Sequence, residues 1–193
     1  EFIYKQPQDF QKNNSKPLKV VYAGNIGDGQ GLHKIIPKLA IKFEGYLNFK
    51  LIGDGGRKKT LIKAIKKAGC NNVYIFPPVN RNELIEHYQK ADILLIHLNE
   101  YQAFKKVLPS KLFEYGAMGK PIWAGVSGYA AEFIKKNIKN SVTFKPCNID
   151  DAVASFEALE IITKERKSFV KKFSRKNIMQ DMSLDIISLA RKD

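Results

Sequence analysis

The stretch that decides the fold is Leu18-Lys19-Val20-Val21-Tyr22-Ala23-Gly24-Asn25-Ile26-Gly27-Asp28-Gly29-Gln30-Gly31. Its first six residues are mostly apolar, which predicts a short strand, and the glycines that follow predict a tight turn. Apolar residues then recur with a helical period, at Leu32, Ile35, Ile36, Leu39, Ala40 and Phe43. The stretch therefore predicts a βα unit, and the backbone amides of such a turn can hold a phosphate.

The same unit repeats along the chain. Further strands are expected at residues 47–52, 72–76, 91–97, 121–124 and 141–145, and helices at 57–68, 80–88, 110–118 and 129–136. The run 93–96 is continuously apolar, as expected for a central parallel strand that is covered on both faces. Alternating strands and helices predict an α/β fold: a Rossmann-like, doubly wound parallel sheet with C-terminal helices.

This pattern divides the chain into three segments. Residues 1–17 are polar and are predicted to be a linker or an extension from a preceding domain. Residues 18–148 form the Rossmann-like domain. Residues 149–193 have an all-helical pattern and are predicted to pack on the same domain or to cross to a neighbour.

Composition narrows the classes of function. No apolar run approaches the ~18 residues that span a bilayer, and Cys70 and Cys147 form neither a metal-binding spacing nor a disulfide framework. We therefore expect a cytoplasmic protein. The formal net charge of +14 suggests nucleic acid, an anionic membrane surface or a phosphorylated substrate as partner. No recognisable nucleic-acid-binding module accompanies the charge, so a nucleic-acid partner is not expected.

The carboxyl edge of the predicted sheet is the expected binding site, because ligands of such sheets bind beyond the carboxyl ends of the strands. Four polar or glycine-rich loops meet there, at residues 24–31, 53–56, 97–110 and 125–128. Their spacing matches neither the dinucleotide fingerprint nor a Walker loop, which disfavours NAD and ATP. His97, Gly128 and Tyr129 are predicted to lie at the edge of this pocket. For His97, a buried wall residue is the alternative.

A second stretch, residues 109–121, supplies charged groups to the same edge. Ser110 is predicted to cap a helix that ends at Gly119. Lys111 and Glu114 add a cation and a carboxylate within one turn of the positive helix terminus, a combination that suits a phosphate followed by a polyol. Taken alone, the pattern also fits a surface helix with a solvated Lys111–Glu114 pair. The position of this helix after the fourth strand, at the expected binding edge of the sheet, favours a ligand-binding role.

Several motifs in this order resemble the nucleotide-binding C-terminal domain of retaining GT-B glycosyltransferases of family 4, also called group 1. They are Gly24-Asn25-Ile26-Gly27 with Gly31-Leu32, Leu51-Ile52-Gly53-Asp54-Gly55, Ala91-Asp92-Ile93, Pro109-Ser110-Lys111-Leu112-Phe113-Glu114-Tyr115 and Gly119-Lys120-Pro121. The resemblance covers about residues 18–190. The segment 124–134 is also similar to N-acetyl-fucosamine transferases of bacterial O-antigen and capsule clusters.

The resemblance implies a glycosyltransferase that moves a sugar from a nucleotide-diphosphate donor, UDP rather than GDP, to a lipid-linked or polysaccharide acceptor. It implies retention of configuration, no metal cofactor, and an acceptor site in a separate N-terminal domain, without which this domain would be inactive. The enzyme would be cytoplasmic, peripheral on the inner face of the membrane. Matching positions imply donor contacts from Gly24, Asn25, Gly27, Arg57, Lys58, Ser110, Lys111, Leu112 and Glu114, with Glu114 on the ribose.

Three positions depart from the family pattern. Asn25 and Gln30 stand where the family has an arginine and a lysine that neutralise the diphosphate, and Lys106 replaces a carboxylate. Lys111 must then carry more of the phosphate charge, helped by Arg57, Lys58, Lys105 or Lys106. Lys111 and Glu100 are the only candidates for catalysis, and Glu100 would substitute for the missing carboxylate.

Two alternatives remain open at the level of sequence. A GT-B sugar-nucleotide epimerase would use the same donor domain and would place its acid–base residues between two domains. A basic nucleic-acid-binding module is the non-enzymatic alternative, and the charge of +14 is its only support.

Overall fold

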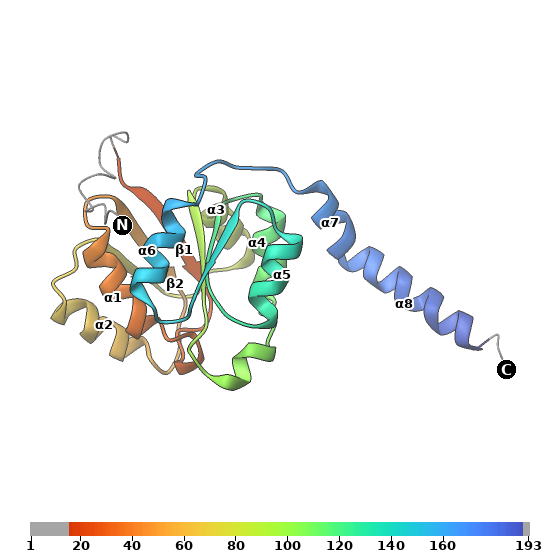
Figure 1. The fold of residues 1–193 in the computed structure, drawn as a ribbon, viewed down its shortest axis with the longest axis horizontal. Helices are drawn as coiled ribbons and strands as arrows, with labels where there is room; N and C mark the ends of the chain where they lie inside the picture. The colour runs from red at the N-terminus through yellow and green to blue at the C-terminus, as the bar shows by residue number, and fades with distance from the viewer. Residues whose placement is uncertain (1–15, 191–193) are drawn as a thin grey trace, which may run out of the picture.

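The computed structural model describes residues 16–190 and contains one six-stranded parallel sheet in the order β3-β2-β1-β4-β5-β6 (Figure 1). The predicted fold class is therefore confirmed. Most of the predicted linker, residues 1–17, lies outside the described residues. The strands are β1 (Leu18–Ala23), β2 (Leu47–Ile52), β3 (Val73–Phe76), β4 (Ile93–His97), β5 (Ile122–Gly125) and β6 (Ser141–Phe144).

Helices cover both faces of the sheet. One apolar core includes α1 (Leu32–Lys42), α2 (Lys58–Lys67) and α6 (Ile149–Glu157). The core on the other face includes α3 (Arg81–Gln89), α4 (Lys111–Met118), α5 (Tyr129–Asn137) and α7 (Lys167–Phe173). Two short 3-10 segments, η2 (Asp28–Gln30) and η3 (Gln102–Lys106), lie in the loops after β1 and β4. The strand order reverses direction between β1 and β4, which is where ligands of open α/β sheets bind.

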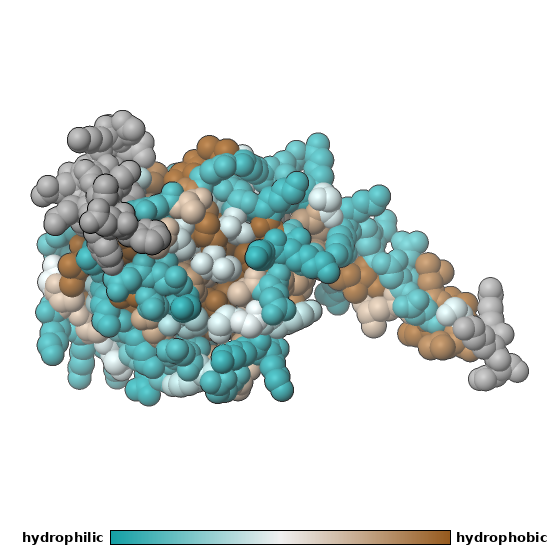
Figure 2. All heavy atoms as spheres, viewed as in Figure 1, coloured by the Kyte–Doolittle hydropathy of each residue, from teal (hydrophilic) through white to brown (hydrophobic). Residues whose placement is uncertain are grey.

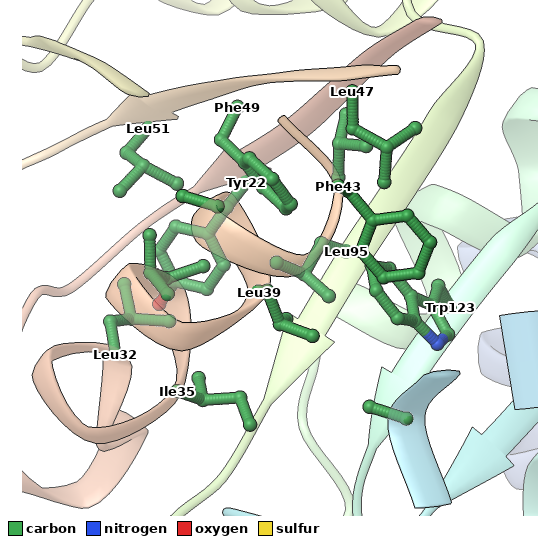
Figure 3. Packing of buried hydrophobic residues seen from close by; sticks show 14 of the residues in the cluster. Tyr22, Leu32, Ile35, Leu39, Phe43, Leu47, Phe49, Leu51, Leu95 and Trp123 are labelled. Carbon is green, nitrogen blue, oxygen red and sulfur yellow. The ribbon is translucent and has the colours of Figure 1, made fainter. Parts of the chain in front are cut away.

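The larger core is built on aromatic side chains (Figure 3). Trp123 of β5 is fully buried, and its ring lies edge-on to Phe43 at a centroid distance of 5.7 Å. The indole Nε1 donates to Ser155 Oγ of α6 at 3.0 Å, so the polar atom of this buried ring is satisfied. This packing holds α6 against the sheet.

Arg166, in the segment between α6 and α7, is a buried residue that holds several segments together through hydrogen bonds. Its guanidinium donates to main-chain carbonyls at the ends of several segments, including those of Gly116, Lys120, Lys139 and Asn140. Burial lowers the pKa of Arg166 to about 10. These hydrogen bonds tie the segment that leads into α7 to the carboxyl end of α4 and to the loops that enter β5 and β6.

The last helix, α8 (Arg175–Ala190), extends away from this body (Figure 1). Its large apolar side chains are exposed, and Figure 2 shows them as brown patches along the projecting helix. The C-terminal helices thus differ in their packing: α6 and α7 lie against the sheet domain, whereas α8 contacts α7 and then leaves the domain surface. No helix within residues 16–190 is both long and apolar enough to cross a bilayer.

Candidate functional site

A cleft of about 320 Å³ opens at the carboxyl ends of β1 and β2. Its walls come from the loops after β1, β2 and β3 and from the start of α3. The lining residues are Ala23, Gly24, Asn25, Ile52, Gly53, Asp54, Pro78, Val79 and Leu84. Pro78, Val79 and Leu84 supply apolar side chains from the β3–α3 side, and two glycines supply main chain at the ends of β1 and β2. The cleft therefore offers an apolar wall beside a wall of backbone.

Main-chain hydrogen bonds join the loop after β1 to the loop after β2. Gly24 N–H donates to Ile52 O at 2.8 Å, and Ile26 N–H donates to Asp54 O at 2.7 Å. Gly53 has φ +149°, and a Cβ at this position would overlap the carbonyl oxygen of Gly24. Only glycine allows this contact, and it places the Gly24 backbone at the floor of the cleft.

Asn25 and Gln30 bind each other. Asn25 Nδ2 donates to Gln30 Oε1 at 3.0 Å, and the same oxygen accepts from Gly27 N–H at 3.2 Å. Two neutral amides therefore close the glycine-rich loop where the family resemblance would place two cations. This loop holds its shape without contributing positive charge to the cleft.

Lys111, the first residue of α4, brings a cation to the cleft. Its Nζ occupies the space that a Cβ on Gly24 would need, and it lies 5.6 Å from the centre of the Tyr22 ring. Burial lowers the pKa of Lys111, while the charge of Glu114 raises it. Within residues 16–190 no hydrogen bond or ion pair is found for this ammonium group. A partly buried cation that makes no direct ion pair among the described residues, beside a helix N-terminus, can receive an anion.

Glu114 lies one turn further along α4. Its Oε1 accepts from Arg81 Nη1 of α3 at 3.3 Å, and the carboxylate side chain is 41% exposed. It also lies near Tyr88, whose pKa is raised to about 12 by burial and, secondarily, by the Glu114 charge. Among residues 16–190 its second carboxylate oxygen makes no hydrogen bond, and Glu114 does not itself line the cleft.

Ser110 and Leu112, the other predicted donor contacts on α4, are placed differently. Ser110 has helical φ and ψ angles of −55° and −30°, and its exposed hydroxyl makes no capping hydrogen bond. The predicted side-chain cap is therefore wrong, because a cap residue needs extended backbone to reach the first-turn amides. The side chain of Leu112 is fully buried in the core, so only its main chain can face a ligand.

Arg57 and Lys58 are already paired with carboxylates. Arg57 Nε lies 2.9 Å from Asp28 Oδ1, and Lys58 Nζ lies 3.2 Å from Asp54 Oδ2. Asp28 also accepts a hydrogen bond from the Tyr101 hydroxyl, and this bond, with the nearby Arg57 charge, lowers the pKa of Asp28. A phosphate would have to displace these carboxylates. Arg57 and Lys58 therefore differ from Lys111, which makes no ion pair among the described residues.

His97 is a buried wall residue with both ring nitrogens in use. Nδ1 donates to Gln30 O at 2.7 Å and Nε2 accepts from Cys147 N–H at 3.0 Å. The Cys147 amide can only donate, so the proton resides on Nδ1. Burial lowers the pKa of His97 to about 4. The ring therefore connects the loops after β1 and β6 and has no free polar atom for a ligand.

Asn99 is a site residue that the sequence motifs did not indicate. It is 1% exposed; its Nδ2 donates to Asp28 O at 2.9 Å and its Oδ1 accepts from Lys34 Nζ at 3.0 Å. Its own N–H donates to Gly29 O at 2.7 Å. An asparagine two residues beyond the central strand is the signal that could have indicated this role, because its amide can both donate to and accept from loops.

The remaining predicted residues lie farther out. The main chain of Lys105 packs on Gly128, where a Cβ would overlap the Lys105 carbonyl oxygen, so η3 rests on the start of α5. Tyr129, Glu100 and Lys106 are exposed. Within residues 16–190 no three His, Cys, Asp or Glu side chains come together as a metal site would require.

Comparisons with known proteins agree with this geometry. Residues 5–176 match the family model for glycosyl transferases group 1. A 100-residue segment is 33% identical to a protein of Escherichia coli (strain K12) named as a colanic acid biosynthesis glycosyl transferase, WcaI, and covers 52% of this chain and 24% of that protein.

Solved structures of the same fold include the lipopolysaccharide outer core galactosyltransferase WaaB in its apo form, with a TM-score of 0.71 and 17% identity over 91% of this chain and 50% of that one. Another is Anabaena Alr3699/HepE in complex with UDP, with a TM-score of 0.71 and 18% identity over 95% and 54%. The chain thus spans about half the length of these structures. On the family match and the shared half of the GT-B fold, the chain belongs to the glycosyl transferases group 1 family.

Proposed function

We propose that this domain binds the nucleotide-diphosphate sugar, a UDP-sugar, for a glycosyltransferase that builds a surface glycan. The observation that carries the proposal is the Lys111 ammonium, which lies partly buried beside Gly24 and makes no direct ion pair or hydrogen bond among the described residues. A diphosphate is the anion that this position suits, since the cation, the α4 N-terminus and the glycine backbone converge there.

The rest of the cleft suits a nucleoside. Ile52, Val79 and Leu84 form an apolar wall for a base. Glu114 lies beyond Lys111 on the same helix, and a carboxylate can accept hydrogen bonds from both ribose hydroxyls. Anabaena HepE, which shares the fold, is described in complex with UDP, and this supports UDP as the first nucleotide to test.

Transfer of the sugar requires stabilisation of the departing nucleoside diphosphate. Oriented amides and the Lys111 cation can provide this as charge develops on the leaving group. We propose that the acceptor, a lipid-linked or polysaccharide glycan, binds mainly outside this chain, which spans about half of its structural relatives. The net charge of +14 would hold the enzyme on the anionic inner face of the membrane.

Calorimetric titration of UDP and GDP into the 193-residue chain tests the proposal. We expect UDP to bind more tightly, and Lys111→Met to weaken UDP binding about 10- to 100-fold, because a charge-assisted contact is worth about 1.5–3 kcal/mol. Lys67→Met, an exposed lysine of α2, is the matched control and should bind as the wild type does. Equal UDP affinity in both variants, or salt-dependent binding of nucleic acid without UDP binding, would exclude the proposed role of Lys111.

A further inference from the structure

A second recess lies on the α3 face of the sheet, closer to the amino ends of the strands than the candidate cleft. We call it the basic groove; its volume is about 390 Å³. It is lined by Lys19 and Val21 of β1, Asn48 and Lys50 of β2, Tyr74 and Phe76 of β3, and His87 and Lys90 of α3 or its end. Three ammonium groups and an imidazole face this space, and no carboxylate lines it among the described residues.

The groove exists because the outer strands lack a helix on this face. α1 and α2 pack on the opposite face of β2 and β3, and α3 packs over β1 and α4. Tyr74 and Phe76 are therefore 49% and 37% exposed. Two exposed aromatic rings beside a row of cations are unusual on the outer surface of a sheet. Exposure of their apolar surface to water is unfavourable, and such surface often marks a binding site.

Lys50 contacts both the imidazole and an aromatic ring of the groove. Its Nζ lies 3.2 Å from His87 Nδ1 and 4.3 Å from the centre of the Phe76 ring. No carboxylate within residues 16–190 forms an ion pair with it. Burial and the charges of Lys90 and Lys19 lower the pKa of Lys50. Burial and the charges of Lys50 and Lys90 lower the pKa of His87, whereas the carboxylates of Glu83 and Glu86 raise it. The cations thus repel one another across the groove. Lys90 is the lining lysine with an ion-pair partner, because its Nζ lies 2.9 Å from Glu86 Oε2.

We propose that the basic groove binds a small soluble phosphate monoester, with the phosphate on Lys50 and Lys19 and its apolar part on Tyr74 and Phe76. A phosphate supplies a counter-charge for Lys50, which forms no ion pair among the described residues, and accepts several hydrogen bonds from ammonium groups at once. The flat rings fit a flat apolar substituent and add the favourable edge or face contacts of aromatic packing. The basic groove does not include Lys111, Gly24 or Glu114. This proposal can therefore be tested independently of the proposed donor cleft.

Titration of phenyl phosphate into isotope-labelled 193-residue chain, followed by NMR, tests the proposal. We expect saturable shifts at the amides of Lys50, Tyr74 and Phe76, whereas phenol and inorganic phosphate should each bind at least about tenfold more weakly. Lys50→Met, which keeps the length of the side chain, should weaken phenyl phosphate binding about tenfold or more. Lys63→Met, an exposed lysine of α2 on the opposite face, is the matched control.

UDP titration of Lys50→Met separates the two sites. The variant should bind UDP as the wild type does, which also shows that it is folded, while Lys111→Met should retain phenyl phosphate binding. The proposal is overturned if the shifts are confined to Gly24 and Lys111, if no shift saturates, or if Lys50→Met binds phenyl phosphate as tightly as Lys63→Met. Sedimentation with phosphatidylglycerol vesicles that depends on Lys50, without phenyl phosphate binding, would instead assign the groove to a membrane surface and would also overturn it.

Discussion

Glu114 can be tested apart from the phosphate contacts because it lies a full helical turn from Lys111. Glu114→Ala should weaken UDP binding about 10- to 100-fold, the loss expected when a charged acceptor is removed. The same change should weaken binding of 2′-deoxy-UDP less, because that nucleotide offers the carboxylate only one of the two hydroxyls. Glu132→Ala, an exposed carboxylate of α5, is the control. Calorimetry that gave equal losses for both nucleotides would argue against a ribose contact.

His97 makes the stability of the domain depend on pH. Its folded-state pKa of about 4 lies below the ordinary value of 6.5 because the ring is buried, so the unfolded chain binds the proton more readily. The stabilisation is thus fully present above about pH 6.5 and is lost as the pH falls towards 4. The difference between the two pKa values corresponds to about 3 kcal/mol.

Urea unfolding at about pH 7.5 and about pH 4.5, on either side of the ordinary histidine pKa, measures this effect. His33 and His87 also have lowered pKa values, so the comparison must be between the wild type and His97→Gln. The variant should be less stable at the higher pH, and it should lose less stability on acidification than the wild type does. Parallel losses in the two proteins would show that His97 is not the group that titrates.

At the level of elements, the junction between the β1 and β2 loops depends on one glycine. Gly53→Ala should destabilise the domain by about 2 kcal/mol or more, because the new Cβ would overlap the Gly24 carbonyl and the residue has φ +149°. Gly56 lies in the same turn without a positive φ, and a Cβ added there would meet no atom within 4 Å, so Gly56→Ala should be nearly neutral. Thermal unfolding of both variants, with UDP titration of each, measures the two effects.

The strands and helices were largely predictable because their signals are local. The apolar run in β4 and the Gly119 stop each act within a few residues, and both are found in the structure. The cap at the start of α3 is equally local. The Asn80 side chain accepts from Glu83 N–H, as a cap should. Such features require no knowledge of tertiary contacts.

The site was less predictable because its polar contacts join distant segments. His97 meets Gln30 across 67 positions and Asn99 meets Asp28 across 71, and nothing near either residue in sequence indicates its partner. Residue type also gave no sign that Arg57 would pair with Asp28 while Lys111 has no such partner among the described residues. The Ser110 cap was wrongly predicted for a related reason: Ser110 lies inside a turn closed by Leu112 N–H and Pro109 O, at 3.0 Å, and therefore has helical backbone angles.

At the scale of the whole molecule, α8 should be dispensable for folding. Deletion of residues 175–193 should leave the melting temperature within about 2 °C, because α8 exposes its large apolar side chains instead of burying them on the body. Deletion from residue 167 is the contrasting control, since it also removes Phe169, which is buried in the core shared with α4 and α5. Calorimetry that showed equal losses for both deletions would place α8 in the cooperative unit.

The burial of Trp123 has a practical consequence for all of these experiments. It is the only tryptophan in the sequence, it is fully buried, and it lies among the rings of Phe43, Phe144 and Phe156. Intrinsic tryptophan fluorescence therefore comes from one apolar environment between β5, α1 and α6. Its emission should be blue-shifted and shielded from iodide, and its red shift on unfolding reports the loss of that contact alone. Fluorescence is thus a clean reporter of this core and a poor one for ligands at the carboxyl edge of the sheet.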